Sequence, residues 1–206
     1  MKSCWYFHQS PNYTRILWVK NHIPSQLDES ISAFCEIKQL ESDIPIDAIL
    51  KFHILYTYGG CWFEPSIFFL RSIGPLFFSY NKYIMTYQSG TGNTTNTNLF
   101  VSLLPNDTRF KKMIDEGLHT ANGIDKRTFA DLVVLPCSWF DGVSLDSKYL
   151  KKDTASELFK TLPSESNTID FSNWYRGSYC MCWNNEWDTQ IEPNSVIDQL
   201  SKIISA

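Results

Sequence analysis

The stretch Ala48-Ile-Leu-Lys51-Phe-His-Ile-Leu-Tyr56-Thr-Tyr58-Gly59-Gly60-Cys-Trp-Phe-Glu64-Pro65-Ser66 decides the fold of this 206-residue chain. Residues 45–58 predict a helix, because a proline stands where the first turn would begin and Gly59 can supply the cap at its end. The apolar runs 61–63 and 67–70 predict two short buried strands. Pro65 separates them because proline cannot donate to a strand ladder.

The rest of the chain alternates between strand and helix patterns in the same way. Runs of β formers predict strands, apolar residues at helical spacing predict helices, and a polar run of Asn, Gly, Thr and Ser predicts a loop. The expected segments are strands 15–20, 82–87 and 132–135, helices from Ser25, over 109–119 and from Asn194, and a loop over 88–97. This alternation predicts a single α/β domain over 1–206 with a mostly parallel central sheet flanked by helices.

Composition excludes several broad classes of protein. With 43% hydrophobic and 19% charged residues, the chain is globular rather than disordered. A net charge of -4 argues against nucleic acid as a partner. No apolar run approaches the roughly 18 residues that span a bilayer, and the start of the chain lacks the apolar stretch of a signal peptide. We therefore expect no transmembrane segment, a cytoplasmic location, and six reduced cysteines.

Lys51, the run from Ile54 to Gly60 and the turn at 64–66 together resemble the donor region of glycosyltransferase family 32, which includes capsular-polysaccharide and mannosyltransferases. A second stretch, 183–187, is similar to the closing Trp-x-x-Ser-Trp of that family. The resemblance covers most of residues 11–187. It implies a GT-A, Rossmann-like fold and the transfer of a hexose from a nucleotide diphosphate sugar to a glycan acceptor, with retention of configuration.

The family grips one divalent ion with an Asp-x-Asp pair, whose carboxylates project to the same side of the chain. The ion stabilises the departing diphosphate, and oxygen ligands suit Mg²⁺ or Mn²⁺. Glu64 and Ser66 stand at these two positions and are the metal positions that the resemblance implies. The catalytic residues that it implies are Glu64 and Glu186. The donor-binding residues that it implies are Lys51, Gly59, Gly60, Asn98, Trp183 and Trp187.

The sequence departs from the family at the positions that hold the metal. Ser66 replaces a carboxylate, Met181 and Cys182 stand where a His commonly completes the site, and Ala48 replaces an Asp. A hydroxyl is a much weaker ligand for a hard cation than a carboxylate, and sulfur is poorly matched to Mg²⁺. Glu186 replaces the family's Ser and could compensate for Ser66.

Three interpretations therefore stay open. The first is a transferase that uses Mn²⁺ or Mg²⁺. The second is a catalytically inactive GT-A scaffold that serves as a binding or interaction module. The third is a metal-independent transferase in which Lys51, Arg71 or Arg176 neutralises the diphosphate.

The family's first strand has no counterpart here, so residues 2–9 or a partner would have to complete the nucleotide site. Membrane association or a Golgi glycan pathway is the alternative location.

Overall fold

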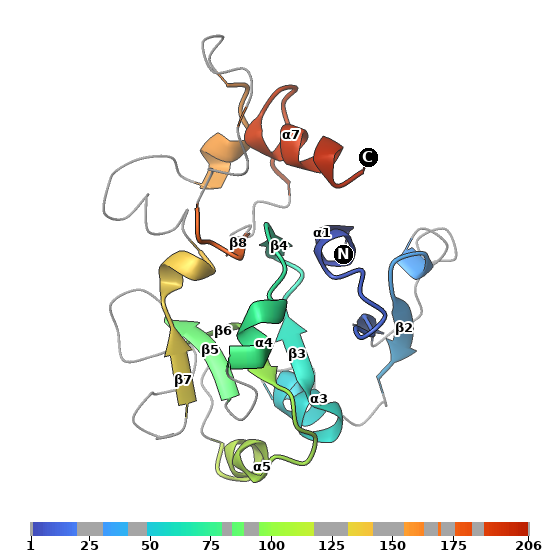
Figure 1. Cartoon of the computed structure of the whole chain (residues 1–206), viewed down its shortest axis with the longest axis vertical. Helices are drawn as coiled ribbons and strands as arrows, with labels where there is room; N and C mark the ends of the chain where they lie inside the picture. The colour runs from blue at the N-terminus through green and yellow to red at the C-terminus, as the bar shows by residue number, and fades with distance from the viewer. Residues whose placement is uncertain are drawn as a thin grey trace.

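The computed structural model describes residues 2–19, 31–40, 49–79, 84–88, 95–117, 132–141, 155–162, 169, 176–182 and 188–205. Figure 1 shows the arrangement of its elements. The helices and 3₁₀ turns are α1 (Lys2–Phe7), α3 (Leu50–Tyr58), α4 (Gly74–Ser79), α5 (Thr108–Asp115), η2 (Cys137–Trp139), η4 (Ala155–Phe159) and α7 (Val196–Ile203). The strands are β1 (Ile16–Val19), β2 (Glu36–Gln39), β3 (Gly60–Phe63), β4 (Ile67–Phe69), β5 (Ile84–Gln88), β6 (Thr95–Ser102), β7 (Leu132–Leu135) and β8 (Cys180–Cys182).

A four-stranded sheet in the order β3-β6-β5-β7 forms the centre of the molecule. β6 runs antiparallel to both of its neighbours, and β5 and β7 are parallel. The fold is thus mixed α/β, as expected. The prediction of a mostly parallel central sheet was wrong, because two of the three strand pairs are antiparallel. The reason lies in chain length: only residues 89–94 connect β5 to β6, whereas a parallel crossover needs a dozen or more residues.

The sheet is buried on both faces, which explains why β6 carries three consecutive apolar residues. Phe100 packs with α3 and α5 in a cluster that contains Phe52, Phe110 and Met113. Its neighbours Leu99 and Val101 point to the other face, into a separate cluster. Side chains alternate along a strand, so a stretch that is covered on both faces by apolar clusters is apolar at successive positions.

β4 and β8 form a second layer beyond the four-stranded sheet, and α7 and η4 cover it (Figure 1). The strands are antiparallel, with Ile67 opposite Cys182 and Phe69 opposite Cys180. Met181 faces the cluster of α7 and η4, whereas Cys180 faces the cluster shared with the central sheet. This short pair therefore joins two cores and fixes residues 180–182 beside residues 67–69.

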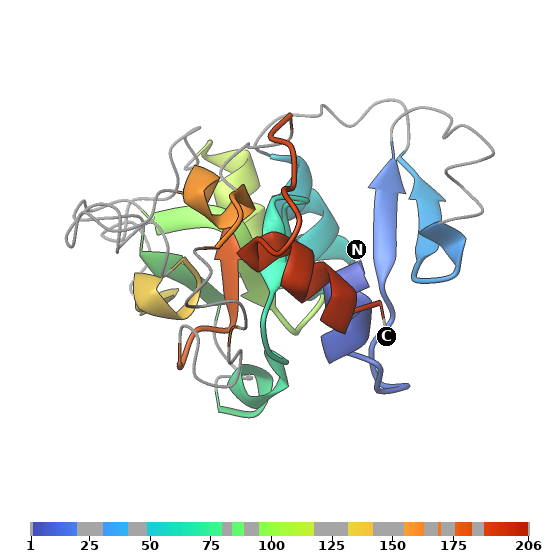
Figure 2. The same ribbon diagram turned by 90° about the horizontal axis from the view of Figure 1, so that it is seen from above.

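β1 and β2 lie side by side at one edge of the molecule, close to α1 (Figures 1 and 2). They are parallel, with Ile16 opposite Glu36. α1 is anchored to β4 through side chains: the Ser3 hydroxyl accepts a hydrogen bond of 3.2 Å from the Phe69 amide. The segment expected to build part of a nucleotide site, residues 2–9, is thus mainly a short helix rather than a strand.

Most of the predicted elements are confirmed within the described residues. The strands at 15–20, 61–63, 67–70 and 132–135 and the closing helix are present, with shifts of a residue or two at their ends. The prediction of a loop over 88–97 was wrong at both ends, since Gln88 belongs to β5 and Thr95 begins β6. Residues 20–30 and 41–48, which hold most of the helix expected from Ser25 and the start of the helix expected from 45, lie outside the described residues.

The apolar faces of the helices agree with the sequence. On α5, Phe110 and Met113 are buried, and on α7, Val196, Ile197 and Leu200 are buried. In the part of the chain that the structure describes, no helix has both the length and the apolar character needed to cross a bilayer.

Candidate functional site

Glu64 opens a tight turn at the carboxyl end of β3. Its backbone carbonyl accepts a hydrogen bond of 3.0 Å from the Ile67 amide, and its own amide donates to the carbonyl of Asn98 on β6 at 2.7 Å. Pro65 takes the second position of this four-residue turn, which suits its fixed φ. The turn carries the chain out of the central sheet and into β4, and it leaves the Glu64 side chain partly exposed.

Lys51 reaches Glu64 from the first turn of α3. Its ammonium Nζ lies 3.1 Å from Glu64 Oε1, and the side chain is only 9% exposed. The indole Nε1 of Trp62 donates to the same carboxylate oxygen at 3.0 Å. An ammonium so deeply buried needs a counter-charge, because burying an unpaired ion is very costly. Glu64 supplies that counter-charge, so Lys51, Trp62 and Glu64 form one hydrogen-bonded unit.

Gly59 and Gly60 make the meeting of Lys51 and Glu64 possible. Both have positive φ, 67° and 97°, and the Gly59 amide caps α3 by donating to the Leu55 carbonyl at 2.9 Å. A Cβ atom on Gly59 would lie 2.9 Å from the carbonyl oxygen of Leu103. The pair lets α3 end tightly against β3. This is a backbone role, and the donor contact implied for these glycines stays a prediction.

Asn98 ties the turn to β8. Its side-chain Nδ2 lies 3.8 Å from Cys182 Sγ, and its backbone carbonyl holds the Glu64 amide. Ser66 is nearly buried, at 9% exposure. The structure therefore brings together Lys51, Glu64, Ser66 and Asn98, from α3, from the turn after β3 and from β6, and the resemblance assigns all four to one donor site.

The remaining site residues cannot be placed in the same way. Trp183, Glu186 and Trp187 lie outside the described residues. Cys182, the last residue of β8, directly precedes Trp183 and sits opposite Ile67. The main chain thus enters the segment 183–187 from a position beside the Glu64 turn.

A divalent ion does not fit the donor set that the structure shows. Two unit charges 4 Å apart interact by about 4 kcal/mol at an effective dielectric constant of about 20. The attraction of an ion to Glu64 would therefore be offset by its repulsion from the Lys51 ammonium, which already lies 3.1 Å from Oε1. That repulsion weakens any ion site at Glu64.

The other expected ligands do not correct this imbalance. Met181 and Cys182 are buried at 2% and 6% exposure, and their soft sulfur atoms suit neither Mg²⁺ nor Mn²⁺. Within the residues that the structure describes, no three His, Cys, Asp or Glu side chains are grouped so that they could share an ion.

The two arginines proposed as substitutes for the ion have different surroundings. The Arg71 guanidinium donates to the backbone carbonyl of Ser178, so it fastens the loop before β8. Arg176 is exposed. The Arg71 contact and the exposed position of Arg176 do not link either side chain to Glu64. Lys51 is the basic residue that the described structure places at the turn.

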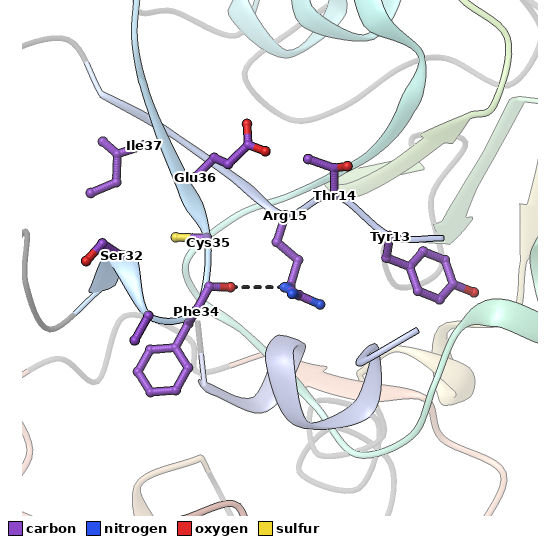
Figure 3. A pocket seen from close by; sticks show the side chains of 9 residues that line it. Tyr13, Thr14, Arg15, Ser32, Phe34, Cys35, Glu36 and Ile37 are labelled. Atoms are coloured by element: carbon purple, nitrogen blue, oxygen red, sulfur yellow. Dashed lines mark hydrogen bonds between the residues drawn. The ribbon is translucent and has the colours of Figure 1, made fainter. Parts of the chain in front are cut away.

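An open cavity of about 590 Å³ lies beside β1 and β2, and sequence reasoning did not single it out. Figure 3 shows the Arg15 side chain there, directed at the carbonyl of Phe34. Its Nε donates to that carbonyl at 3.0 Å and its Nη1 to the His8 carbonyl at 2.6 Å. The lining residues are Tyr13, Thr14, Arg15, Ser32, Ala33, Phe34, Cys35, Glu36 and Ile37.

This cavity is a weaker candidate than the Glu64 turn. Its residues precede or begin β1 and β2, so it lies at the amino ends of these parallel strands, whereas ligands of open α/β sheets bind beyond the carboxyl ends. The Arg15 guanidinium also donates hydrogen bonds to two backbone carbonyls, which gives it a structural role. We therefore take the turn at Glu64 as the candidate site.

Neither the scan against protein-family models nor the search of curated proteins found a match to this chain.

Proposed function

We propose that this chain is a glycosyltransferase-like protein of GT-A type that transfers a hexose from a nucleotide diphosphate sugar to a glycan acceptor with retention. One observation carries the proposal: Lys51, at the start of α3, lies 3.1 Å from Glu64, at the end of β3. The resemblance assigns both residues to the donor site. In the reaction, the bond between the sugar and the diphosphate breaks and a bond to an acceptor hydroxyl forms.

The arrangement of the surrounding segments favours this proposal. The Glu64 turn contacts β6 through Asn98, and β8 pairs with the strand that leaves the turn. Segments distant in sequence thus converge on a partly exposed carboxylate at the carboxyl end of a strand.

The proposed roles follow from these positions. Glu64 is proposed to contact the sugar or ribose of the donor, because its carboxylate is 31% exposed. Lys51 is proposed to hold that carboxylate in place and to balance its charge. Trp183, Trp187 and Glu186, which follow β8, are proposed to complete the donor pocket. No step uses a divalent ion, because the described donor set does not fit one.

A binding module without catalysis is the second candidate. The observation that favours it is the use of Glu64 Oε1 by both Lys51 and Trp62. A carboxylate held in this way also resembles a structural ion pair that fixes a turn. This candidate predicts binding of a protein or glycan without any turnover of donor sugar.

The decisive experiment combines binding and turnover. Calorimetric titration with UDP and with GDP tests for a nucleotide site, and release of nucleoside diphosphate from sugar donors tests for transfer or hydrolysis. The double variant Glu64→Ala/Glu186→Ala is expected to lose turnover, whereas Glu157→Ala, an exposed residue paired with Lys160, should keep it. Turnover that survives in the double variant would contradict the proposed roles, and nucleotide binding without turnover would favour the binding module.

A further inference from the structure

The Glu64 turn already contains a cation of its own. The Lys51 ammonium lies 3.1 Å from Glu64 Oε1 and comes from a side chain that is 9% exposed. A charge at this distance competes with any ion that binds the same oxygen. The position is fixed by α3, whose residues around Lys51 are packed among buried neighbours such as Phe52 and Leu55.

The pair is also electrically balanced. Glu64 contributes one negative charge and Lys51 one positive charge, and the Trp62 indole adds a third group that donates to Oε1. Ser66, the position at which a second carboxylate would be expected, is a nearly buried hydroxyl. Among the residues that the structure describes, the turn therefore lacks the excess negative charge that hard divalent cations require.

We infer that Lys51 replaces the divalent ion at this site, so that Glu64 binds no Mn²⁺ or Mg²⁺ and a nucleoside diphosphate binds without metal. The second half of this statement rests on the proposed function, because it assumes that the ligand is a nucleotide. The first half does not, because it concerns only the ion and the turn.

The first arm of the test measures the ion alone. Mn²⁺ is titrated into the full chain, and bound Mn²⁺ is followed by electron paramagnetic resonance. The control is Glu64→Gln, a variant that keeps an oxygen for Trp62 but removes the charge. We expect the wild type and this variant to bind Mn²⁺ equally, because Glu64 forms no Mn²⁺ site. A wild-type site that Glu64→Gln abolishes would overturn the inference.

The variant Lys51→Met provides the converse measurement. It removes the ammonium, keeps a side chain of similar length, and leaves the Glu64 carboxylate without its counter-charge. We expect it to show an Mn²⁺ site that the wild type lacks, while Lys160→Met, which breaks an exposed pair, should show none. If Lys51→Met does not fold, the comparison of wild type with Glu64→Gln still decides.

The second arm uses UDP and GDP, each with Mn²⁺ and with EDTA. Dissociation constants that agree within twofold under both conditions, and that weaken at least tenfold in Lys51→Met, support the inference. Nucleotide binding that appears only with Mn²⁺ overturns it while leaving the proposed function intact. Absence of nucleotide binding under every condition contradicts the proposed function, and the first arm then decides the statement about the ion.

Discussion

The imidazole of His8 joins the end of α1 to the loop before α4, because its Nε2 accepts a hydrogen bond of 3.0 Å from the backbone amide of Ile73. The other ring nitrogen, Nδ1, lies 2.9 Å from the Cys4 carbonyl. One nitrogen accepts and the other donates, so the contacts define a neutral imidazole with its proton on Nδ1. A proton added to Nε2 would remove the acceptor on which the buried Ile73 amide depends.

We expect the folded state to lose stability in mild acid through His8. Burial lowers the pKa of His8 below its ordinary value of 6.5, and the nearby Arg15 charge lowers it further, against an opposing effect of the Cys4 carbonyl. Between the two pKa values, His8 is therefore protonated in the unfolded chain and neutral in the folded chain. The contribution is complete above the unfolded pKa of 6.5 and declines as the pH falls toward the folded pKa.

Thermal unfolding of wild type and His8→Asn between pH 7.5 and about pH 5 measures this effect. The variant should be less stable at neutral pH by about 1–3 kcal/mol, the cost of an unsatisfied buried donor. Its stability should also depend less on pH. Parallel pH profiles for the two proteins would show that His8 does not couple folding to protonation.

Gly59 is expected to tolerate substitution far less well than its neighbour Gly60. Both have positive φ, but a Cβ on Gly59 would lie 2.9 Å from the Leu103 carbonyl, whereas a Cβ on Gly60 meets nothing within 4 Å. Positive φ alone costs a non-glycine residue about 1–2 kcal/mol. Gly59→Ala should exceed this cost, and Gly60→Ala should stay near it.

Chemical denaturation of the two alanine variants tests the difference. Gly60→Ala is the matched control, since it shares the strained φ without the close backbone contact. Equal losses of unfolding free energy would mean that the α3–β3 junction relaxes around the new methyl group. Such a junction would not hold Lys51 and Glu64 in one fixed arrangement.

The strands could be predicted where local pattern and burial agree. The β formers of 15–20 and 132–135 became β1 and β7, and the helical spacing of Val196, Ile197 and Leu200 became the buried face of α7. On β7 and α7 the side chains that give the pattern pack in the core clusters, and on β1 they are half-buried. Local sequence is then sufficient.

The start of β6 shows where composition fails. Thr95 opens the strand and is fully buried, although its polar neighbours suggest a loop. The ladder with β5, in which Thr95 faces Gln88, is made by backbone groups and needs no apolar side chain. Likewise α1 depends on contacts with Phe69 and Ile73, more than 60 residues away, which no local pattern reveals.

The site was predicted in part for a similar reason. The register from Lys51 to Glu64 predicted that both residues belong to one place, and the glycine pair predicted the tight turn between them. Sequence spacing could not predict that the two charges would neutralise each other at 3.1 Å, since that depends on side-chain conformation. The metal positions are thus implied by the resemblance alone, while the geometry shows an ion pair at the first of them.

Asp107 is expected to stabilise α5 as its N-cap. Its Oδ1 accepts a hydrogen bond of 2.9 Å from the Arg109 amide, and the Arg109 side chain also donates to the carboxylate. Replacing such a cap by Ala costs about 1 kcal/mol. Asp107→Ala should lose about that amount at neutral pH, and Asp107→Asn should lose less because it keeps an acceptor for the amide.

The pH dependence of this loss separates the cap from general packing. The hydrogen bonds from the Arg109 side chain hold the pKa of Asp107 below its ordinary value of 3.8. The stabilisation is therefore complete above that ordinary value and disappears as the pH falls through the folded pKa. Urea titrations at pH 7 and near pH 3 should show the difference between wild type and Asp107→Ala shrinking in acid. A difference that is constant with pH would point to packing alone.

The thiols of the core are expected to resist alkylation for as long as β8 stays in place. Cys180 has no exposed surface, and burial, followed by the nearby Asp141 charge, raises its pKa well above the ordinary value. Burial likewise raises the pKa of Cys4 to about 11. Because the thiolate is the reactive form, both residues should stay unmodified at pH 8 in the folded protein.

Mass spectrometry after iodoacetamide treatment, with and without urea, measures this protection residue by residue. Cys137 is partly exposed and serves as the internal control that the reagent reaches the protein. Cys180 should react only when urea unfolds the chain. Rapid labelling of Cys180 without urea would mean that β8 separates from β4, in which case Cys182 would not be held opposite Ile67, beside the Glu64 turn.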